Sequence, residues 1–526
     1  MKRGRLLAVL VLVVLSGCAL PGDTGGFDAD RELGHVGDYA SGDDFTFDTS
    51  NGLTRNQLEA VKYRAMARIE VVRGLKFSRD VELEVVSRAE YRNRRAGTEG
   101  NASAFRNELW RGAFVVDGET DVGRAFDDLY GDSVQGYYVN DRVVIVSDDT
   151  DRIRIDRWVL VHELTHALQD QQFGIARESD RVDGVRAENG LIEGEANYVS
   201  RQYDRRCGAE WQCMPERRGP TASGETLSDR PFNVGLFLSI YAPYAEGTPF
   251  VADLHERDGW DSVDRAHGNP PRSTSQLIHP DHYPDREPID VAIPDRSSDD
   301  WRPITKGTDG SNGGAPVART ETLGEATLFA TLWANGVIDR PLTAGTSEFA
   351  TYNYSHPATA GWAGDAVQVY RNMANRNRTG HVWRLTWDSP ADAAAFADAY
   401  RTLLTRRGAE IVESTAVTER DVYRIPDGTQ FAGAYRIDVT SDTVEIVGAP
   451  SVDDIAAIHA AGPVSEQNGS LETASALEPA TPISSSRSED DIEPQAVEGY
   501  SSPRDFAGRT GTSQRTSGTT RAAVDG

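Results

Sequence analysis

The sequence predicts an α+β protein with two folded domains, and three observations support this class. The chain has 526 residues, of which 38% are hydrophobic, which is enough for two or three domains with cores of their own. Segments with helical spacing of apolar residues alternate with shorter segments of strand-like pattern. A strongly apolar helix follows a predicted hairpin within about fifteen residues, and its apolar surface predicts that it is buried.

Residues 1–18 are expected to be an export signal. Lys2, Arg3 and Arg5 precede an unbroken apolar run over residues 6–15, which is too short to span a bilayer as a stable helix. The run ends in "LSGC", which resembles the lipobox of bacterial and archaeal lipoproteins and implies that Cys18 becomes a lipid anchor. An ordinary cleaved signal with an incidental cysteine is the alternative. We expect the mature protein at the extracellular face of the cell membrane, lipid-anchored.

The first domain is predicted over residues 52–267, after a flexible tether over residues 19–51 that is rich in Gly, Asp and Ser. Its first elements are expected to be a helix, a strand, a second helix and a hairpin with Asn140-Asp141 at its turn, over residues 54–73, 81–86, 102–114 and 134–147. The apolar helix follows the hairpin, and two further helices are expected over residues 190–203 and 231–240.

The second domain is predicted as a small α+β unit over residues 321–461. A loop or linker over residues 268–320, dominated by Pro, Asp, Ser and Gly, should precede it. The expected elements are a helix, two strands, a helix that begins near Pro390 and a strand pair, over residues 321–333, 366–372, 381–389, 390–408 and 434–449. Residues 462–526 are mostly Ser, Thr, Glu, Pro and Gly, which predicts a disordered tail.

The charge of the chain excludes one class of partner. With 82 acidic and 55 basic residues, the formal net charge is -27, which repels nucleic acid and anionic membrane surfaces. Lysine occurs at four positions only, and strong acidity with so little lysine is typical of halophilic proteins. We therefore expect no nucleic-acid binding.

Two cysteines remain besides Cys18. Cys207 and Cys213 have five residues between them, and in an exported protein such a pair most plausibly forms a disulfide that closes a small loop. A metal site is less favoured, because the segment holds no histidine and zinc-binding cysteines are usually separated by two to four residues.

The apolar helix carries the clearest chemical motif, in the stretch "RWVLVHELTHALQDQQFG". Residues four apart on a helix project from one face, so His162 and His166 can ligate one divalent ion through their imidazole nitrogens. Glu163 lies one residue round from His162, where it can act as general base on a metal-activated water without ligating the metal. The pattern predicts a Zn²⁺ site. Zinc lowers the pKa of a water bound to it to about 7.

A third ligand is expected from the segment "LIEGEANYVSRQY", which carries Glu193 and Glu195. At this point the sequence resembles the gluzincin metallopeptidases, in which a later helix bears a ligand glutamate. More narrowly, it is similar to exported families with HELTHALQDQ and EGEA or EGDA motifs, which include haloarchaeal surface lipoproteins. The gluzincin register favours Glu193 over Glu195 and places Asn197 where an aspartate would support the first histidine. An amide there supplies no negative charge, which implies weaker support of that histidine.

The resemblance implies a zincin-like first domain and extends over about residues 53–449. It implies that the hairpin strand before the helix is the edge strand along which an extended peptide pairs. The segments "PPRSTSQLIHPDHY" and "GWAGDAVQVY" also match these families. An oxyanion stabiliser is expected as well, with His279 as the first candidate and Tyr244 and Tyr283 as others.

Three functions are compatible with these features. The first is a lipid-anchored extracellular zinc peptidase that hydrolyses peptide or protein substrates. The second is a non-catalytic surface lipoprotein that keeps a structural metal site and binds a partner through its second domain. The third, a solute-binding lipoprotein, explains the anchor but not the HELTH motif. Other histidines, at positions 267, 282, 356 and 381, are expected to be solvated, and the oligomeric state stays open.

Overall fold

The computed structural model describes residues 26–95, 101–130, 134–215, 232–306, 317–412 and 421–462. The predicted export signal of residues 1–18 with Cys18, and the tail from residue 463, lie outside these ranges. In the described part of the chain, no helix combines the length and the apolar character needed to cross a membrane.

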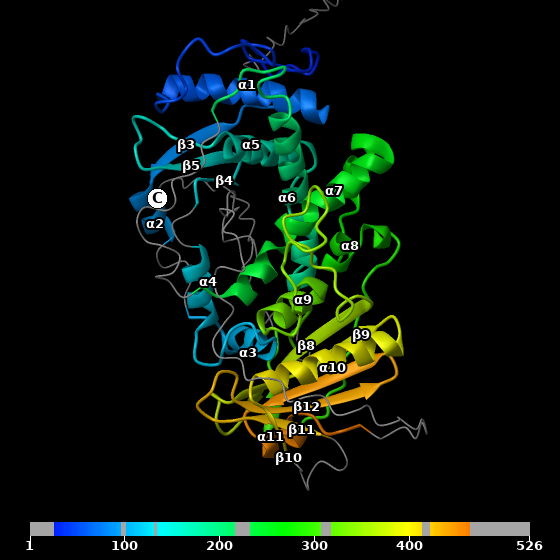
Figure 1. Cartoon of the computed structure of the whole chain (residues 1–526). Coiled ribbons are helices and arrows are strands. Elements are labelled where there is room, and N and C mark those ends of the chain that lie inside the picture. Colours follow the sequence, from blue (N-terminus) through cyan, green and yellow to red (C-terminus); the bar gives the residue numbers. More distant parts are fainter. Residues whose placement is uncertain are drawn as a thin grey trace, which may run out of the picture.

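The fold is mixed α+β, as the sequence predicts. The helices are α1 Arg55–Arg73, α2 Arg88–Arg95, α3 Ala104–Gly112, α4 Val122–Tyr130, α5 Arg157–Gln172, α6 Val182–Asp204, α7 Val234–Gly268, α8 Thr274–Ile278, α9 Gly324–Ala334, α10 Pro390–Arg406 and α11 Val452–Ile458. The strands are β1 His35–Val36, β2 Tyr39–Ala40, β3 Glu82–Ser87, β4 Gly136–Val139, β5 Arg142–Ser147, β6 Trp301–Pro303, β7 Thr320–Glu321, β8 Trp362–Asn372, β9 Thr379–Trp387, β10 Glu410–Val412, β11 Val422–Ile425, β12 Gly433–Thr440 and β13 Thr443–Ala449. Figure 1 places β3, β4, β5 and α5 toward one end of the molecule and the strands β8 to β13 toward the other, with α6, α7 and α9 between them.

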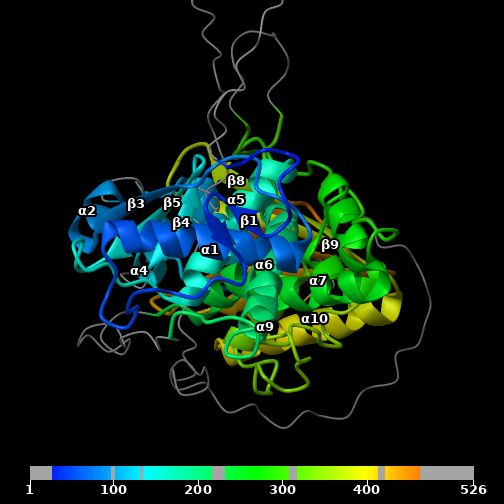
Figure 2. The same cartoon turned by 90° about the horizontal axis from the view of Figure 1, so that it is seen from above.

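A three-stranded sheet of order β3-β5-β4 lies against α5. β3 pairs with β5 in parallel and β4 pairs with β5 antiparallel. Asn140 and Asp141 join β4 to β5 with φ of 48° and 65°, the left-handed pair that a two-residue hairpin turn requires. Viewed from above, α1 lies across this end of the molecule (Figure 2).

The N-terminal segment corrects the prediction of a flexible tether. Its described part, residues 26–51, packs on α1: Phe27 and Val36 are buried, and Arg31 forms an ion pair with Glu70 of α1. The backbone N–H of Gly34 also donates to Glu70, at 3.0 Å. The Gly- and Asp-rich composition predicted disorder, but buried apolar side chains and the buried carboxylate of Glu70 anchor the segment on α1.

The helices α6 and α7 cross at glycines. An added Cβ at Gly194 would lie 2.2 Å from the carbonyl oxygen of Gly247, and one at Gly247 would lie 2.1 Å from the carbonyl oxygen of Gly190. The two backbones therefore touch. α7 is far longer than the predicted helix over residues 231–240, and non-helical backbone at Asp258 and Gly259 interrupts it.

The segment predicted as a loop or linker over residues 268–320 carries α8, β6 and the first residue of β7, and it holds helix ends together. Thr274 of α8 donates its backbone N–H to Asp183 at the start of α6, at 3.1 Å. Asp365 accepts the N–H groups of Leu323 and Gly324 at the start of α9, at 3.0 and 2.9 Å. The segments around Thr274 and Asp365 thus contribute to a junction of three helix N-termini, where carboxylates accept hydrogen bonds from backbone N–H groups.

The second predicted domain forms the large sheet of order β10-β11-β12-β13-β9-β8-β6, with β7 also paired to β8. α10 and α11 bury side chains against it in two different hydrophobic clusters. The cluster that includes α10 residues also contains side chains of α3, α4, α7 and α9, and it runs from Val86 to Ile446. One core therefore extends through both predicted domains.

Candidate metal centre

The helix α5 begins at a capped end and is buried through most of its length. Asp156 caps it by accepting the backbone N–H of Trp158 at 2.7 Å, and its residues from Val159 to Gln169 are buried. His162 and His166 project from one face: their ring centroids are 4.6 Å apart and their Nε2 atoms 3.0 Å apart. The four-residue spacing thus produces the juxtaposition that the motif predicts.

Glu193 of α6 completes the group. Its Oε2 lies 3.1 Å from Nε2 of His162 and 3.3 Å from Nε2 of His166. The three ligand atoms all lie within 4.8 Å of one another and are buried, so the group could hold a metal ion. Two imidazoles and one carboxylate are a donor set that suits zinc and leaves room for a further ligand.

Glu195 belongs to a different set of contacts. Its carboxylate pairs with Arg73 of α1 and with Nε2 of His267 at the end of α7, at 2.5 Å for the latter. The choice between the two glutamates is therefore made by helix geometry. Residues 193 and 195 are about 200° apart around α6, so the two side chains cannot face α5 in the same way.

His162, His166 and Glu193, which we call the triad, each favour the charged form of a neighbour. Burial alone would raise the pKa of Glu193, but the neighbouring His166 and His162 hold it well below its usual value. Burial opposes the charge on His166, and the Glu193 carboxylate raises its pKa to about 9. The metal-free triad is thus a buried imidazolium–carboxylate pair, and a divalent cation that binds there must displace a proton.

Glu163 lies next to His162 on α5 and is not one of the three ligands. Its side chain is fully buried, and neither carboxylate oxygen has a hydrogen-bond partner in the described ranges. Burial is the main cause that raises its pKa above the usual value. The charges of His162 and His166 and a backbone contact from Tyr138 favour the ionised form but do not outweigh burial, so keeping this carboxylate charged costs free energy.

The edge strand differs in one respect from the expectation. The strand directly before α5 is β5, which is the central strand, and β4, the first strand of the hairpin, is one of the two edge strands. β4 lies close to the triad, because an added Cβ at Gly136 would lie 3.6 Å from Cγ of Glu163. Gln135 accepts the N–H of Val146 in the ladder, so the backbone groups of Gly136 and Tyr138 turn away from β5.

Residues around the ligands include several that sequence reasoning missed. Nδ1 of His166 lies 2.8 Å from Oε1 of Gln169, and Nε2 of Gln169 lies 2.7 Å from Glu195. Gln169 stands three residues after His166 in the motif itself, a spacing that could have indicated the contact. Nδ1 of His162 has no partner in the part of the chain that the structure describes, so Asn197 does not support it.

The expected oxyanion stabilisers lie in other surroundings. Nε2 of His279 contacts Glu325 of α9 at 2.9 Å, and its ring lies beside that of His282, whereas no contact joins it to the triad within the described ranges. The hydroxyl of Tyr283 donates to the carbonyl of Asn269, and the ring of Tyr244 stacks on Tyr241. The role of His279 stays a prediction.

The expectation of solvated histidines is wrong at two positions. His267 is buried against Glu195, and its ring stacks on Phe173 at 4.2 Å. His381 is fully buried and contacts Glu108. Each lies at an element end or strand start, and each is buried by segments distant in the chain, which no local pattern indicates.

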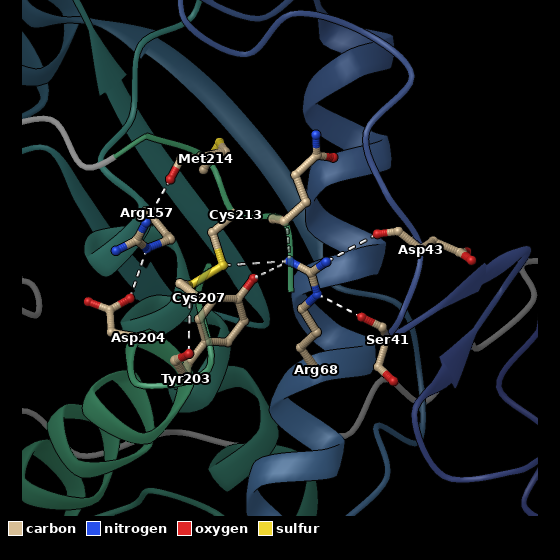
Figure 3. Close-up of a disulfide and its surroundings, with 10 residues drawn as sticks. Ser41, Asp43, Arg68, Arg157, Tyr203, Asp204, Cys207, Cys213 and Met214 are labelled. Atoms are coloured by element: carbon tan, nitrogen blue, oxygen red, sulfur yellow. Dashed lines mark hydrogen bonds and ion pairs between the residues drawn. A yellow bond between two sulfur atoms is a disulfide. The ribbon is translucent and has the colours of Figure 1, made fainter. Parts of the chain in front are cut away.

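Cys207 and Cys213 form a disulfide in the structure. Figure 3 shows Arg68 of α1 beside it, with its guanidinium donating to the carbonyls of Ser41 and Asp43 at 2.8 and 3.1 Å and to the hydroxyl of Tyr203 at 3.2 Å. The disulfide closes its loop directly after α6. Arg68, a buried residue of α1, thus joins the N-terminal segment to α6, the helix that carries Glu193.

Comparison with known proteins yields one match. A family model described as a domain of unknown function, DUF8575, matches residues 315–459. This range holds α9, α10, α11 and the strands β7 to β13, and the triad lies outside it. No curated protein and no solved structure matches the chain.

Proposed function

We propose that this protein is a zinc-dependent peptidase that acts at the extracellular face of the cell membrane. The observation that carries the proposal is Glu163, a fully buried carboxylate whose oxygens have no hydrogen-bond partner of good geometry among the described residues, next to a ligand histidine. A purely structural metal site has no use for such a group, because its burial costs free energy that the charges of His162 and His166 and a backbone contact from Tyr138 offset only in part. A general base, in contrast, needs a carboxylate that can take up a proton.

The residues of the triad fit zinc. His162, His166 and Glu193 come from two adjacent helices and place two nitrogens and one oxygen within ligand distance of a common point. Catalytic zinc sites take three protein ligands of this kind and keep a fourth position for substrate or water. When bound, zinc would supply Lewis-acid polarisation of a peptide carbonyl and make a water more acidic.

The chain's own residues would perform the remaining steps. Glu163 is placed to accept a proton from the attacking water and to return it to the leaving amine. The outward backbone groups of Gly136 and Tyr138 on β4 can hold an extended peptide by strand addition beside Glu163. A sheet with an antiparallel edge strand next to the HExxH helix supports a zincin-like first domain, in line with the resemblance to gluzincins.

The test is the variant Glu163→Gln in the purified full-length protein. We expect it to bind zinc like the wild type, because the ligands are kept, and to lose cleavage of a fluorogenic peptide library by about 100-fold or more, because the general base is lost. Glu188→Gln is a control of similar burial on α6, where Glu188 accepts two backbone N–H groups. It should keep both properties.

Other outcomes would favour other functions. A wild-type protein that holds zinc but cleaves no peptide would favour the non-catalytic surface lipoprotein. A zinc-free protein that binds a small molecule would favour the solute-binding lipoprotein. The disulfide between Cys207 and Cys213 supports an oxidising compartment, and we propose that Cys18 carries the lipid, which fractionation of cells that produce the protein would check.

A further inference from the structure

We propose that Gln169 and Glu195 are positioning residues of the metal centre, which fix the orientation and the protonated nitrogen of His166. The inference rests on the proposed zinc site and adds to it two residues that ligate nothing. Its physical basis is an unbroken series of hydrogen bonds from a buried carboxylate to a ligand imidazole. We call Gln169, Glu195, Arg73 and His267 the supporting cluster.

The orientation of the Gln169 amide is forced by its neighbours. Its Nε2 lies 2.9 Å from the carbonyl oxygen of Ile192 and 2.7 Å from Oε2 of Glu195. A carbonyl and a carboxylate only accept hydrogen bonds, so the amide must turn its NH₂ group toward them. Oε1 of Gln169 therefore faces Nδ1 of His166, at 2.8 Å.

The orientation of the amide sets the proton on His166. An amide oxygen can only accept, so Nδ1 of His166 must carry the hydrogen. The lone pair that can bind a cation is then on Nε2, the nitrogen that lies 3.0 Å from Nε2 of His162 and 3.3 Å from Glu193. Gln169 thus selects the tautomer that metal binding needs.

Glu195 is itself held from three helices. It pairs with Arg73 of α1 and His267 of α7, and it accepts from Gln169 of α5 while it belongs to α6. Arg73 is buried, lies 4.4 Å from the ring of Trp260 and also pairs with Asp264. This packing leaves the carboxylate no freedom to move, and its charge polarises the Gln169 amide toward a stronger acceptor.

The supporting cluster also accounts for the departure from the gluzincin pattern. An aspartate is expected to supply negative charge to the first histidine, but Asn197 stands there and Nδ1 of His162 has no partner in the described part of the chain. Negative charge reaches the second histidine instead, from Glu195 through Gln169. The second glutamate of the EGEA motif thus acts on the metal centre without touching it.

The test measures the zinc dissociation constant of the full-length protein by competition with a chelator. We expect Gln169→Leu to weaken zinc binding by about 10- to 100-fold, the usual effect of losing a partner of a ligand histidine. Gln171→Leu is the matched control: Gln171 lies two residues on in α5 and accepts the N–H groups of Ser78 and Arg79. It should leave zinc affinity unchanged.

A spectroscopic measurement keeps the test independent of the variant's stability. In ¹⁵N-labelled metal-free wild type, the His166 imidazole should carry a proton on Nδ1, protected from exchange, whether or not its pairing with Glu193 also keeps a proton on Nε2. A proton found on Nε2 alone would overturn the proposal, and so would a folded Gln169→Leu protein with wild-type zinc affinity. Zinc-loaded wild type that cleaves no peptide would instead overturn only the peptidase function, and wild type that binds no zinc would overturn both.

Discussion

Glu108 of α3 shows how single buried charges hold distant parts of this chain together. It accepts hydrogen bonds from Arg111, at 3.0 Å to one oxygen, and from Nδ1 of His381 on β9 at 2.7 Å. The ring of His381 fits between Gly112 and Gly448, where an added Cβ would lie within 2.7 and 2.1 Å of it. The carboxylate therefore joins a helix of the first predicted domain to the sheet of the second.

Replacing Glu108 should be strongly destabilising. Glu108→Gln leaves the buried charge of Arg111 without its partner, which we expect to lower the free energy of unfolding by about 3–5 kcal/mol in urea titrations. Glu90→Gln is the control, because Glu90 pairs with Arg94 at the exposed surface and its loss should cost less than about 1 kcal/mol. Equal effects of the two variants would contradict this account.

The same carboxylate predicts a pH dependence. Burial alone would raise the pKa of Glu108, but Arg111 and His381 lower it to about 2. Because the folded pKa lies below the unfolded value, the stabilisation is present above about pH 4.5 and is lost as the pH falls toward 2, with a total of about 3 kcal/mol. The difference in stability between wild type and Glu108→Gln should shrink over that window.

At the level of elements, the contact of α6 with α7 sets the position of Glu193. The two backbones touch at Gly190, Gly194 and Gly247, so α6 can approach α7 closely on one side while Glu193 faces α5. Gln169 of α5 also donates hydrogen bonds to Ile192 and Glu195 of α6, and these bonds hold α6 against α5. A shift of α6 would therefore move the third ligand.

Gly194→Ala should test this dependence. The new methyl group would meet the carbonyl of Gly247 at 2.2 Å, so α6 and α7 must separate, which should cost about 1–3 kcal/mol of stability and weaken zinc binding. Gly268→Ala, at the end of α7, is the control because nothing lies within 4 Å of its added Cβ. Unchanged melting temperature and zinc affinity in Gly194→Ala would contradict the close contact.

For the whole molecule, hydrophobic packing stabilises the fold, whereas the net negative charge destabilises it. One hydrophobic cluster extends from Val86 to Ile446, and the polar junctions at Asp365 and Glu108 join the same parts of the chain. We therefore expect the described fold to unfold as one cooperative unit. The net charge of -27 opposes compaction through self-repulsion.

Salt should therefore stabilise the protein. Raising KCl from 0.1 to 1 M shortens the Debye length from about 10 to about 3 Å, which screens repulsion between surface carboxylates. The urea midpoint should rise over this range, in a single transition monitored by both tryptophan fluorescence and circular dichroism. A midpoint that falls with salt, or two separate transitions, would argue against this balance of forces.

The sequence by itself determined the local features. Helical spacing marked α1, α5 and α10, and Asn140-Asp141 marked the hairpin turn, because these signals depend on residues within one or two turns of each other. The four-residue spacing of His162 and His166 likewise fixed their shared face before any packing was known. The α+β class follows from the sum of such local patterns.

Only the tertiary structure decided which distant groups meet. It selected Glu193 rather than Glu195, brought Glu195 into contact with Gln169, and packed the segment of residues 26–51 on α1 through Phe27 and Val36, where composition predicted a flexible tether. Contacts of this kind depend on how whole helices cross, as at Gly194 and Gly247, and helix crossing is set by packing over long sequence separations. The residue pattern within a single segment does not indicate where two helices cross.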